Sequence, residues 1–354
     1  MRILIYGAGA IGSYLGAHLA LAGHQVTLLG REPLVQAVEA DGLLLSTPQG
    51  QHRIREIRAV NNIEAALDGD TVYDWIAFTM KSYDTVSAIF ELHEHLPEPP
   101  PIACFQNGIG NEESLRDAFG TDKVVAAAVT TAISMQQPGT VIEERRRGVA
   151  IASDLPASAR VGSAFRGTGL HVAMIPNPAA LKWSKLLTNL VANAVCAILD
   201  MPPDKVLRDP RLFRIEQAAL REALVIMRLK GIPVIDLPQA PVRALAVAAQ
   251  RLPTVMLHPL LWRWLAAGRG GKAPSLLAAL RAGKRRTEVA WINGGVVQAA
   301  QSINFLAPVN HALALLVSDI VAGRVVWEAY RGKPDMLITS IRAVKGMRMN
   351  AGPQ

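Results

Sequence analysis

Three polar residues stand at intervals of four in a stretch of the chain that is otherwise apolar. They are Lys185, Asn189 and Asn193, and Lys182 extends the same edge as a competing lysine. Residues four apart share one face of an α-helix, so these side chains should project together. Because an ammonium or amide group is costly to bury without a partner, the spacing predicts a helix face that borders a polar cleft. The alternative is an ordinary solvent-exposed helix face.

Three further residues are single candidates for a ligand site. Lys81 follows an expected strand at residues 74–80, and Asn107 follows another at residues 101–106. Ligands of α/β sheets bind just beyond the carboxyl ends of such strands. Glu288 is a single acid at the start of an apolar, helical stretch. The plain alternatives are loop caps for Lys81 and Asn107 and a first-turn helix acid for Glu288.

The beginning of the chain carries the spacing of a dinucleotide-binding turn. An apolar strand at residues 1–6 leads into a glycine-rich turn, and an apolar helix follows. The turn consists of Gly7, Ala8, Gly9, Ala10, Ile11 and Gly12. The first glycine permits a tight turn, the second lets a pyrophosphate approach the backbone, and the third lets helix and strand pack closely. The free N–H groups of the helix N-terminus would then face the phosphates.

The residue after the second strand indicates which dinucleotide is bound. Strand 25–29 is followed by Gly30 and Arg31, where NAD-binding proteins usually have an acidic residue that binds the ribose 2′-hydroxyl. A guanidinium can instead hold a 2′-phosphate through charge-assisted hydrogen bonds. We therefore expect NADP(H). The alternative is that Arg31 is a surface residue and that Glu32 binds the ribose.

The elements that position these residues predict two domains of different class. Residues 1 to about 172 alternate strand and helix signals, with a hairpin at 43–59 and short strands at 124–131, 140–144, 149–152 and 171–175. We expect the short strands to be antiparallel additions to a parallel sheet. Asn177 and Pro178 are a good N-cap and first residue for a helix that should run to about Leu199. The fold class is α/β, with a Rossmann-type dinucleotide-binding domain at 1–175, an all-helical domain at 176–344 and a frayed tail at 345–354.

The amino-acid composition indicates which binding partners and which cellular compartment to expect for this protein. The chain has 354 residues and a net charge of +8, which suits anionic cofactors and acids. The basic clusters have little aromatic interleaving, so we expect no nucleic acid, and no uninterrupted apolar stretch has membrane length. Two cysteines in apolar segments suit a reducing cytoplasm. The eight histidines show no metal-ligand spacing apart from His93 and His95, which we expect on the surface. An apolar second half is compatible with a homodimer and equally with a buried core.

These motifs, taken in order, resemble the ketopantoate reductase family (2-dehydropantoate 2-reductases). The resemblance runs along nearly the whole chain. It rests on the glycine turn, Arg31, the Met80-Lys81 and Gln106-Asn107-Gly108 turns, the helix from Lys185 to Asn193, and Thr287-Glu288 with Asn293-Gly294. The lysine–asparagine–asparagine helix with the late Thr-Glu is much more specific than the glycine turn, which many families share.

The resemblance implies an activity and a role for each residue. It implies that NADPH reduces a 2-oxo acid, typically ketopantoate to (R)-pantoate in pantothenate biosynthesis, in a cleft between the two domains. Lys185 would be the general acid, and Glu288 would pair with it and hold the substrate or the cofactor ribose. Asn189 and Asn193 would bind substrate oxygens. Arg31 and Lys81 would take the 2′-phosphate and neighbouring cofactor groups, and Asn107 would lie near the nicotinamide ribose. Such chemistry is coherent, because hydride addition makes an alkoxide that needs a proton and positive charge.

The chain departs from the family pattern where the substrate would be recognised. Pro274-Ser275 stands where relatives carry a Ser-Met-x-Gln-Asp-like segment, so Ser275 is the substrate-binding candidate there. The segment Pro238–Lys272 is longer than expected and could form a lid or reshape the pocket. The alternatives are therefore a reductase of a different 2-oxo acid, a related β-hydroxyacid dehydrogenase, or a non-catalytic NADP(H)-binding sensor.

Overall fold

The computed structural model describes residues 1–69, 71–269 and 273–350, and its contacts divide the chain into two compact units. The N-terminal unit comprises Met1–Lys185 with Asp236–Ala240, and the C-terminal unit comprises Leu186–Ile235 with Pro241–Gln354. The division falls inside helix α7 (Pro178–Leu190), whereas the boundary predicted near residue 175 lies just before that helix. The return of Asp236–Ala240 to the N-terminal unit has no signal in the sequence.

The N-terminal unit is built on a large, mostly parallel sheet with the order β12-β11-β8-β7-β6-β1-β2-β5. Its strands are β1 (Arg2–Tyr6), β2 (Gln25–Leu29), β5 (Arg58–Val60), β6 (Trp75–Phe78), β7 (Ile102–Cys104), β8 (Val124–Val129), β11 (Val149–Ala152) and β12 (Val172–Ile175). Six neighbouring strands of this sheet, β8, β7, β6, β1, β2 and β5, pair in parallel. This confirms the parallel strands expected within 74–80 and 101–106. Strand β11 is antiparallel to β8, as expected for an addition at the edge. The prediction that the strand at 124–131 is itself such an antiparallel addition is wrong, because β8 pairs in parallel with β7.

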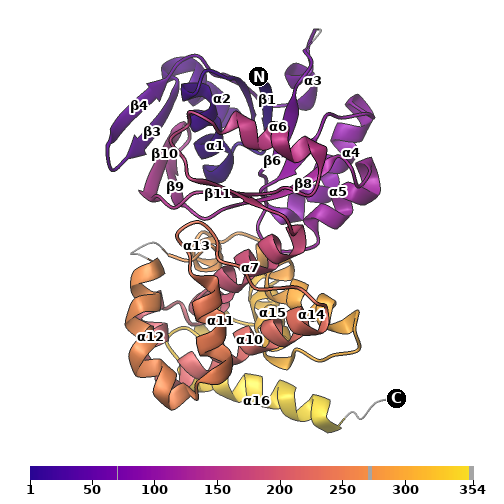
Figure 1. The fold of residues 1–354 in the computed structure, drawn as a ribbon. Coiled ribbons are helices and arrows are strands. Elements are labelled where there is room, and N and C mark those ends of the chain that lie inside the picture. Colours follow the sequence, from indigo (N-terminus) through magenta and orange to yellow (C-terminus); the bar gives the residue numbers. More distant parts are fainter. Residues whose placement is uncertain (70, 270–272, 351–354) are drawn as a thin grey trace. The chain divides into compact units, whose positions relative to one another are not determined.

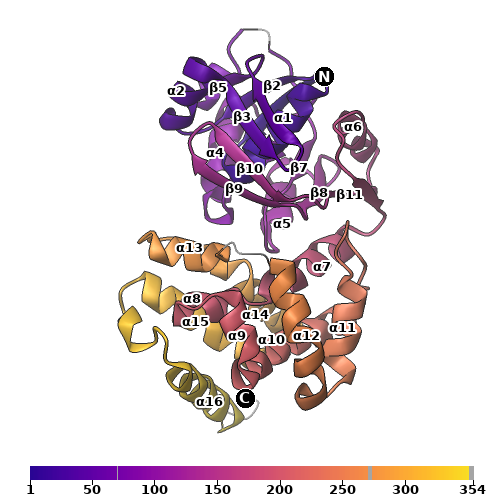
Figure 2. The ribbon, with the colours of Figure 1, turned by 90° about the vertical axis from the view of Figure 1, so that its left-hand side faces the viewer.

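Helices cover both faces of this sheet, and the apolar strands explain why. In β1, Ile3 and Ile5 join one buried cluster while Leu4 and Tyr6 join another, because successive side chains point to opposite faces. The first cluster includes residues of α1 (Ala10–Leu21), α2 (Glu32–Asp41) and α6 (Pro156–Ala164). The second includes residues of α3 (Ile63–Ala66), α4 (Thr85–His95) and α5 (Asn111–Phe119) (Figures 1 and 2). The expected Rossmann-type α/β architecture is confirmed.

A second, smaller sheet in the same unit corrects one expectation. It has the order β4-β3-β10-β9, with bounds β3 (Leu43–Thr47), β4 (Gly50–Ile54), β9 (Ala132–Gln137) and β10 (Thr140–Arg145). The hairpin predicted at 43–59 is confirmed as β3 and β4. The prediction that the strand at 140–144 extends the parallel sheet is wrong, because β10 pairs with β3 and with β9. The hydroxyl of Thr131 accepts the N–H groups of Arg147 and Gly148, each at 3.1 Å, so β9 and β10 leave the main sheet together at that point.

The C-terminal unit is helical throughout its described residues. Its helices are α8 (Ala194–Leu199), α9 (Pro203–Arg208), α10 (Pro210–Leu229), α11 (Val242–Arg251), α12 (Thr254–Arg269), α13 (Ser275–Arg281), α14 (Asn293–Gln301), α15 (Pro308–Val321) and α16 (Pro334–Asn350), with short 3-10 turns η2 (Glu288–Ala290) and η3 (Trp327–Ala329). Helix α10 packs against α9, α11, α12, α14 and α15. Most of the segment Pro238–Lys272 forms α11 and α12, while its first residues, up to Ala240, belong to the N-terminal unit. Its last residues, 270–272, lie outside the described part. Helix α16 continues to Asn350, beyond the start of the frayed tail expected at 345.

Candidate functional site

The glycine turn after β1 adopts a conformation that explains each of its glycines. Gly7 has a φ of 98°, and a Cβ atom there would lie 2.3 Å from the backbone nitrogen of Met80. A Cβ atom on Gly12 would lie 2.5 Å from Oγ1 of Thr79. On Gly9, by contrast, a Cβ atom would meet nothing closer than the carbonyl oxygen of Gly7 at 4.0 Å. The protein therefore fills the space at Gly7 and Gly12 and leaves it open at Gly9.

The N-terminus of α1 is available to an anion. Gly9 is its N-cap and provides no side-chain cap, and the first turn holds no acidic residue. Within the described ranges, the amide groups of Ala10, Ile11 and Gly12 have no protein acceptor. Unpaired N–H groups together with the helix dipole favour a phosphate group at this position. These residues, with the open side of Gly9, fit a dinucleotide pyrophosphate.

Arg31 and Glu32 differ in how they are engaged. Arg31 is exposed at the N-cap of α2, directly beyond β2, and its guanidinium has no partner among the residues the structure describes. The carboxylate of Glu32 accepts hydrogen bonds from Nε2 of Gln36 at 2.9 Å and from Nδ2 of Asn61 at 2.6 Å. The carboxylate of Glu32 is thus already occupied by its neighbours, while Arg31 is exposed to solvent.

The turns after β6 and β7 are joined by hydrogen bonds. The side-chain amide of Gln106 donates to the carbonyl oxygen of Met80 at 3.1 Å and to the hydroxyl of Thr85 at 2.8 Å. The carbonyl oxygen of Asn107 accepts from the hydroxyl of Ser82 at 2.9 Å. The structure therefore brings the Lys81 turn and the Asn107 turn together at the carboxyl ends of their strands, as expected. Lys81 is exposed and Asn107 is partly buried.

Two lysines of α7 have different surroundings. The ammonium of Lys182 donates to the carbonyl oxygen of Gln106 at 2.6 Å and to that of Ala127 at 3.3 Å, and it lies 2.7 Å from Oε1 of Glu112. Burial alone would lower the pKa of Lys182, but the Glu112 carboxylate outweighs it and raises that pKa. Lys185, one turn further along, is only partly buried.

The helix that carries the two asparagines is interrupted. The prediction of one helix from residue 178 to 199 is wrong, because α7 ends at Leu190 and α8 begins at Ala194. Ala192 has a φ of 48°, and its N–H group donates to the carboxylate of Glu216 in α10 at 2.8 Å. Ala–Leu-rich sequence gives no sign of such a break, since the group that stabilises it lies 24 residues away.

The break places Asn189 and Asn193 in different environments. Nδ2 of Asn193 donates to the carbonyl oxygen of Asn189 at 3.1 Å, and Oδ1 of Asn193 accepts the N–H of Leu276 at 3.3 Å. Asn193 is buried, whereas Asn189 is partly buried. Ser275, the first residue of α13, precedes Leu276 and is exposed. The structure therefore brings Asn189, Asn193 and the Ser275 segment together within the C-terminal unit.

Glu288 begins η2 in the C-terminal unit and is buried, with 4% of its surface exposed. The backbone turns directly after Glu288, because Trp291 and Ile292 both donate their N–H groups to the carbonyl oxygen of Glu288. Nearby in sequence, Nδ2 of Asn293 donates to Oδ1 of Asn310 at 3.0 Å. The late Thr-Glu segment is thus a fixed part of the helical core.

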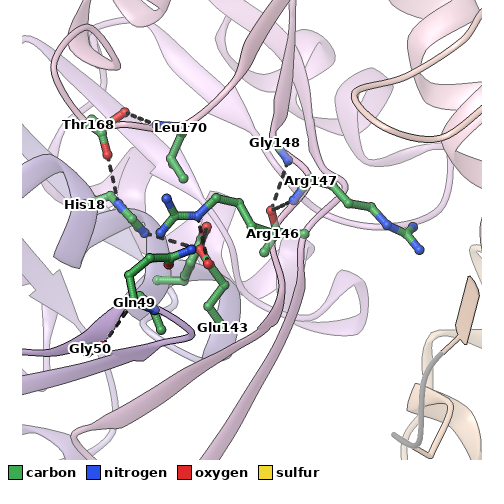
Figure 3. A network of polar contacts seen from close by, with 12 residues as sticks. His18, Gln49, Gly50, Glu143, Arg146, Arg147, Gly148, Thr168 and Leu170 are labelled. Atoms are coloured by element: carbon green, nitrogen blue, oxygen red, sulfur yellow. Dashed lines mark hydrogen bonds and ion pairs between the residues drawn. The ribbon is translucent and has the colours of Figure 1, made fainter.

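A buried carboxylate that the sequence did not single out holds the second sheet on α1 (Figure 3). Glu143 of β10 accepts the hydroxyl of Tyr14 at 2.6 Å and Nε of Arg146 at 2.8 Å, and its carboxylate lies 3.8 Å from Nε2 of His18. Nδ1 of His18 lies 3.1 Å from the carbonyl oxygen of Thr168. Burial would raise the pKa of Glu143, but its interactions with His18, Tyr14 and Arg146 lower it to about 2. With 129 residues between Glu143 and Tyr14, no local pattern could have identified the pair.

The described residues contain no helix with both the length and the apolar character needed to cross a bilayer. They also contain no cluster of three or more side chains suited to hold a metal ion. Cys104 and Cys196 are both buried, and neither forms a disulfide bond within the described residues.

The sheet, the open glycine turn and the joined turns beyond β6 and β7 define a dinucleotide-binding protein of the α/β class. The chain belongs to the ketopantoate reductase family, which is a family of oxidoreductases. The family model described as Ketopantoate reductase PanE/ApbA matches residues 3–153, and the model of its C terminal part matches residues 177–321.

Known relatives support this assignment over most of the chain. A 2-dehydropantoate 2-reductase of Pyrococcus horikoshii is 28% identical over 323 residues, which cover 90% of this chain and 96% of the relative. The crystal structure of a PanE/ApbA family ketopantoate reductase from Ralstonia eutropha JMP134 is similar with a TM-score of 0.77 and 28% identity, covering 92% of this chain and 99% of that one. A D-mandelate dehydrogenase in a ternary structure with NADH and anilino(oxo)acetate has a TM-score of 0.75 at 18% identity, with 91% and 99% coverage, and shows the fold alone.

Proposed function

We propose that this protein uses NADPH to reduce a 2-oxo acid, specifically ketopantoate to (R)-pantoate in pantothenate biosynthesis. The observation that carries the proposal is the difference between the lysines of α7. Lys182 is buried against Glu112, while Lys185 stays partly exposed on the helix that also carries Asn189. In a member of an oxidoreductase family, this leaves Lys185 as the lysine that can reach a substrate.

The residues of the N-terminal unit support binding of the cofactor. The amides of Ala10 and Ile11 and the open side of Gly9 suit the pyrophosphate, and the Asn107 turn suits the nicotinamide ribose. When bound, NADPH supplies the hydride. Arg31 and Lys81 suit the 2′-phosphate and neighbouring groups, because both are exposed cations beyond strand ends. The engagement of Glu32 with Gln36 and Asn61 favours NADP(H) over NAD(H).

Proton transfer is the task assigned to Lys185. As the carbonyl oxygen of a 2-oxo acid becomes an alkoxide, a nearby ammonium stabilises its charge and donates a proton to it. Asn189 suits hydrogen bonds to substrate oxygens, and Asn193 holds Asn189 through its backbone carbonyl. Two residues of the C-terminal unit complete the proposed set of catalytic and substrate-binding residues. Glu288 contributes a carboxylate and Ser275 contributes a hydroxyl.

Two buried cysteines that form no disulfide bond favour a reducing compartment, so we place the enzyme in the cytoplasm. Its proposed partners are small acids, with neither nucleic acid nor membrane among them. A homodimer is compatible with this proposal, but the proposal does not require one.

Steady-state oxidation of NADPH with a panel of 2-oxo acids tests the proposal. Ketopantoate, pyruvate and 2-oxoisovalerate should each be offered at matched concentrations, with NADH as the cofactor control. Selective turnover of ketopantoate supports the proposal. Preference for another acid would instead indicate a reductase of a different substrate, and binding of NADPH without any turnover would indicate a sensor.

A further inference from the structure

We propose that Lys182 is a positioning residue for this reaction: it anchors α7 to the turn that carries Asn107 and thereby sets the direction of Lys185. The inference rests on the proposed function, because it concerns the placement of the proposed proton donor. All the residues on which the inference depends lie in the N-terminal unit.

The ammonium of Lys182 is surrounded by protein oxygens. It donates hydrogen bonds to the carbonyl oxygens of Gln106 and Ala127 and forms an ion pair with the carboxylate of Glu112 at 2.7 Å. Lys182 is 5% exposed and Glu112 is 3% exposed. A buried ammonium that is held by two hydrogen bonds and an ion pair is positioned by the protein and is shielded from a substrate.

The acceptors of Lys182 lie where the cofactor turns begin. Gln106 follows β7, and Ala127 is in β8, the next strand of the sheet. The side chain of Gln106 donates to Met80 and Thr85, so the anchor extends to the turn that carries Lys81. Glu112 lies in the first turn of α5, directly after the Asn107 turn. Lys182 thus connects α7 to both turns, directly through Gln106 and Glu112 and onward through the side chain of Gln106.

Helix geometry carries the effect from Lys182 to Lys185. Residues three apart in an α-helix are displaced by about 4.5 Å along the axis and by roughly 60° around it. When the side chain of Lys182 is fixed at the strand ends, the rotation of α7 about its own axis is fixed as well. The direction in which Lys185 projects from α7 then follows.

Stability alone is a weak reason for this buried pair. Two charges taken out of water lose hydration, and apolar side chains of similar size are often at least as stabilising. An ion pair with directed hydrogen bonds differs from an apolar contact chiefly in that it specifies one geometry. We therefore assign the pair to positioning, and the test must separate geometry from folding.

The test is the double variant K182M/E112Q, which removes both charges and nearly keeps both volumes. Its matched control is K123M/E98Q, which removes a lysine–glutamate pair on the exposed surface of the same unit. The measurements are the thermal midpoint, the Kd for NADPH by fluorescence, kcat and KM for ketopantoate, and the pH profile of kcat.

We expect the double variant to fold, to bind NADPH several-fold more weakly, and to lose kcat by about 10- to 100-fold, since a displacement of about 1 Å can cost 10²-fold. The KM for ketopantoate should change less than kcat, and the pH profile should keep its shape because Lys185 still donates. The control variant should match the wild type. Wild-type kcat and Kd in the double variant would overturn the proposal. A lost pH limb in the double variant, with the limb retained in K185A, would make Lys182 the acid and overturn it too.

Two further arms keep the result decisive. If the double variant does not fold, K182R replaces it, since arginine retains the charge beside Glu112 but has a planar fork of different reach. Unchanged kcat in K182R would argue against a requirement for the lysine geometry, and a reduced kcat with unchanged stability would support it. If the wild type reduces no 2-oxo acid, the proposed function fails, yet the Kd for NADPH still tests whether Lys182 positions the Asn107 turn.

Discussion

Lys185 and Lys182 show how two identical side chains three residues apart acquire different tasks. Lys182 is surrounded by acceptors and carries a buried charge, while Lys185 is partly exposed. The amino-acid pattern placed both on one helix edge, and it could not separate them because Glu112 and Ala127 come from distant parts of the chain. The family motif predicts that Lys185 is the proton donor, and the burial of Lys182 is the observation on which our proposal of that role depends.

Replacing Lys185 by alanine should remove the proton donor. We expect K185A to lower kcat with ketopantoate by about 10²- to 10⁴-fold, the range for loss of a general acid. The Kd for NADPH should stay within a few-fold of the wild type, because the glycine turn is untouched. Steady-state kinetics and fluorescence titration check both parts. An unchanged kcat would remove Lys185 from the mechanism.

Arg31 should report on the 2′-phosphate. The R31A variant removes an exposed guanidinium that makes no side-chain contact in the described structure, so the fold should be unaffected. Loss of one charge-assisted contact should weaken NADPH binding by about 1.5–3 kcal/mol, or roughly 10- to 100-fold. NADH binding should hardly change. Titrations with both cofactors measure this, and equal losses for NADPH and NADH would mean that Arg31 does not bind the 2′-phosphate.

At the scale of elements, the glycine turn offers a matched pair of substitutions. A methyl group at Gly9 faces open space, whereas a methyl group at Gly12 would lie 2.5 Å from Thr79 and 2.7 Å from the carbonyl oxygen of Gly7. We expect G9A to retain its thermal midpoint but to bind NADPH at least about tenfold more weakly. We expect G12A to lose about 1–3 kcal/mol of stability through overpacking. Thermal unfolding and NADPH titration distinguish them, and a destabilised G9A with normal affinity would contradict the assignment.

The sequence predicted the elements well where the signal was local. The strand–turn–helix at the N-terminus, the hairpin of β3 and β4, and the helical second half all follow from patterns of apolar and glycine residues. The departures arise from contacts distant in sequence. Glu216 stabilises the left-handed Ala192 and ends α7 early, and Thr131 directs β9 and β10 into a separate sheet. Neither partner is detectable from periodicity, because a single side chain decides each outcome.

For the molecule as a whole, the network around Glu143 predicts how stability depends on pH. The pKa of Glu143 is lowered from 4.5 to about 2, so its contribution to stability is fully present above about pH 4.5 and is lost as the pH falls toward 2. This shift corresponds to about 3 kcal/mol, at 1.36 kcal/mol for each pKa unit. We expect E143Q to lower the free energy of unfolding at neutral pH and to reduce its loss in acid.

Denaturant unfolding at several pH values measures this effect. The exposed neighbour Glu144 provides the control variant E144Q, which should match the wild type within about 0.5 kcal/mol. An E143Q protein as stable as E144Q at neutral pH, with the same loss of stability in acid, would show that Glu143 does not hold the second sheet on α1.

The segment Asp236–Ala240 has a consequence for how this protein can be divided. Because these residues belong to the N-terminal unit, the backbone passes between the units at three points along the sequence. The hydroxyl of Thr130 donates to the carbonyl oxygen of Pro238 at 3.1 Å, so this unit is completed by residues translated after α10. No single scission can release the dinucleotide-binding half intact. During synthesis, the N-terminal unit therefore remains incomplete after the first 185 residues, until residues 236–240 have also been made. A fusion protein that contains only residues 1–185 would lack this last segment of the unit.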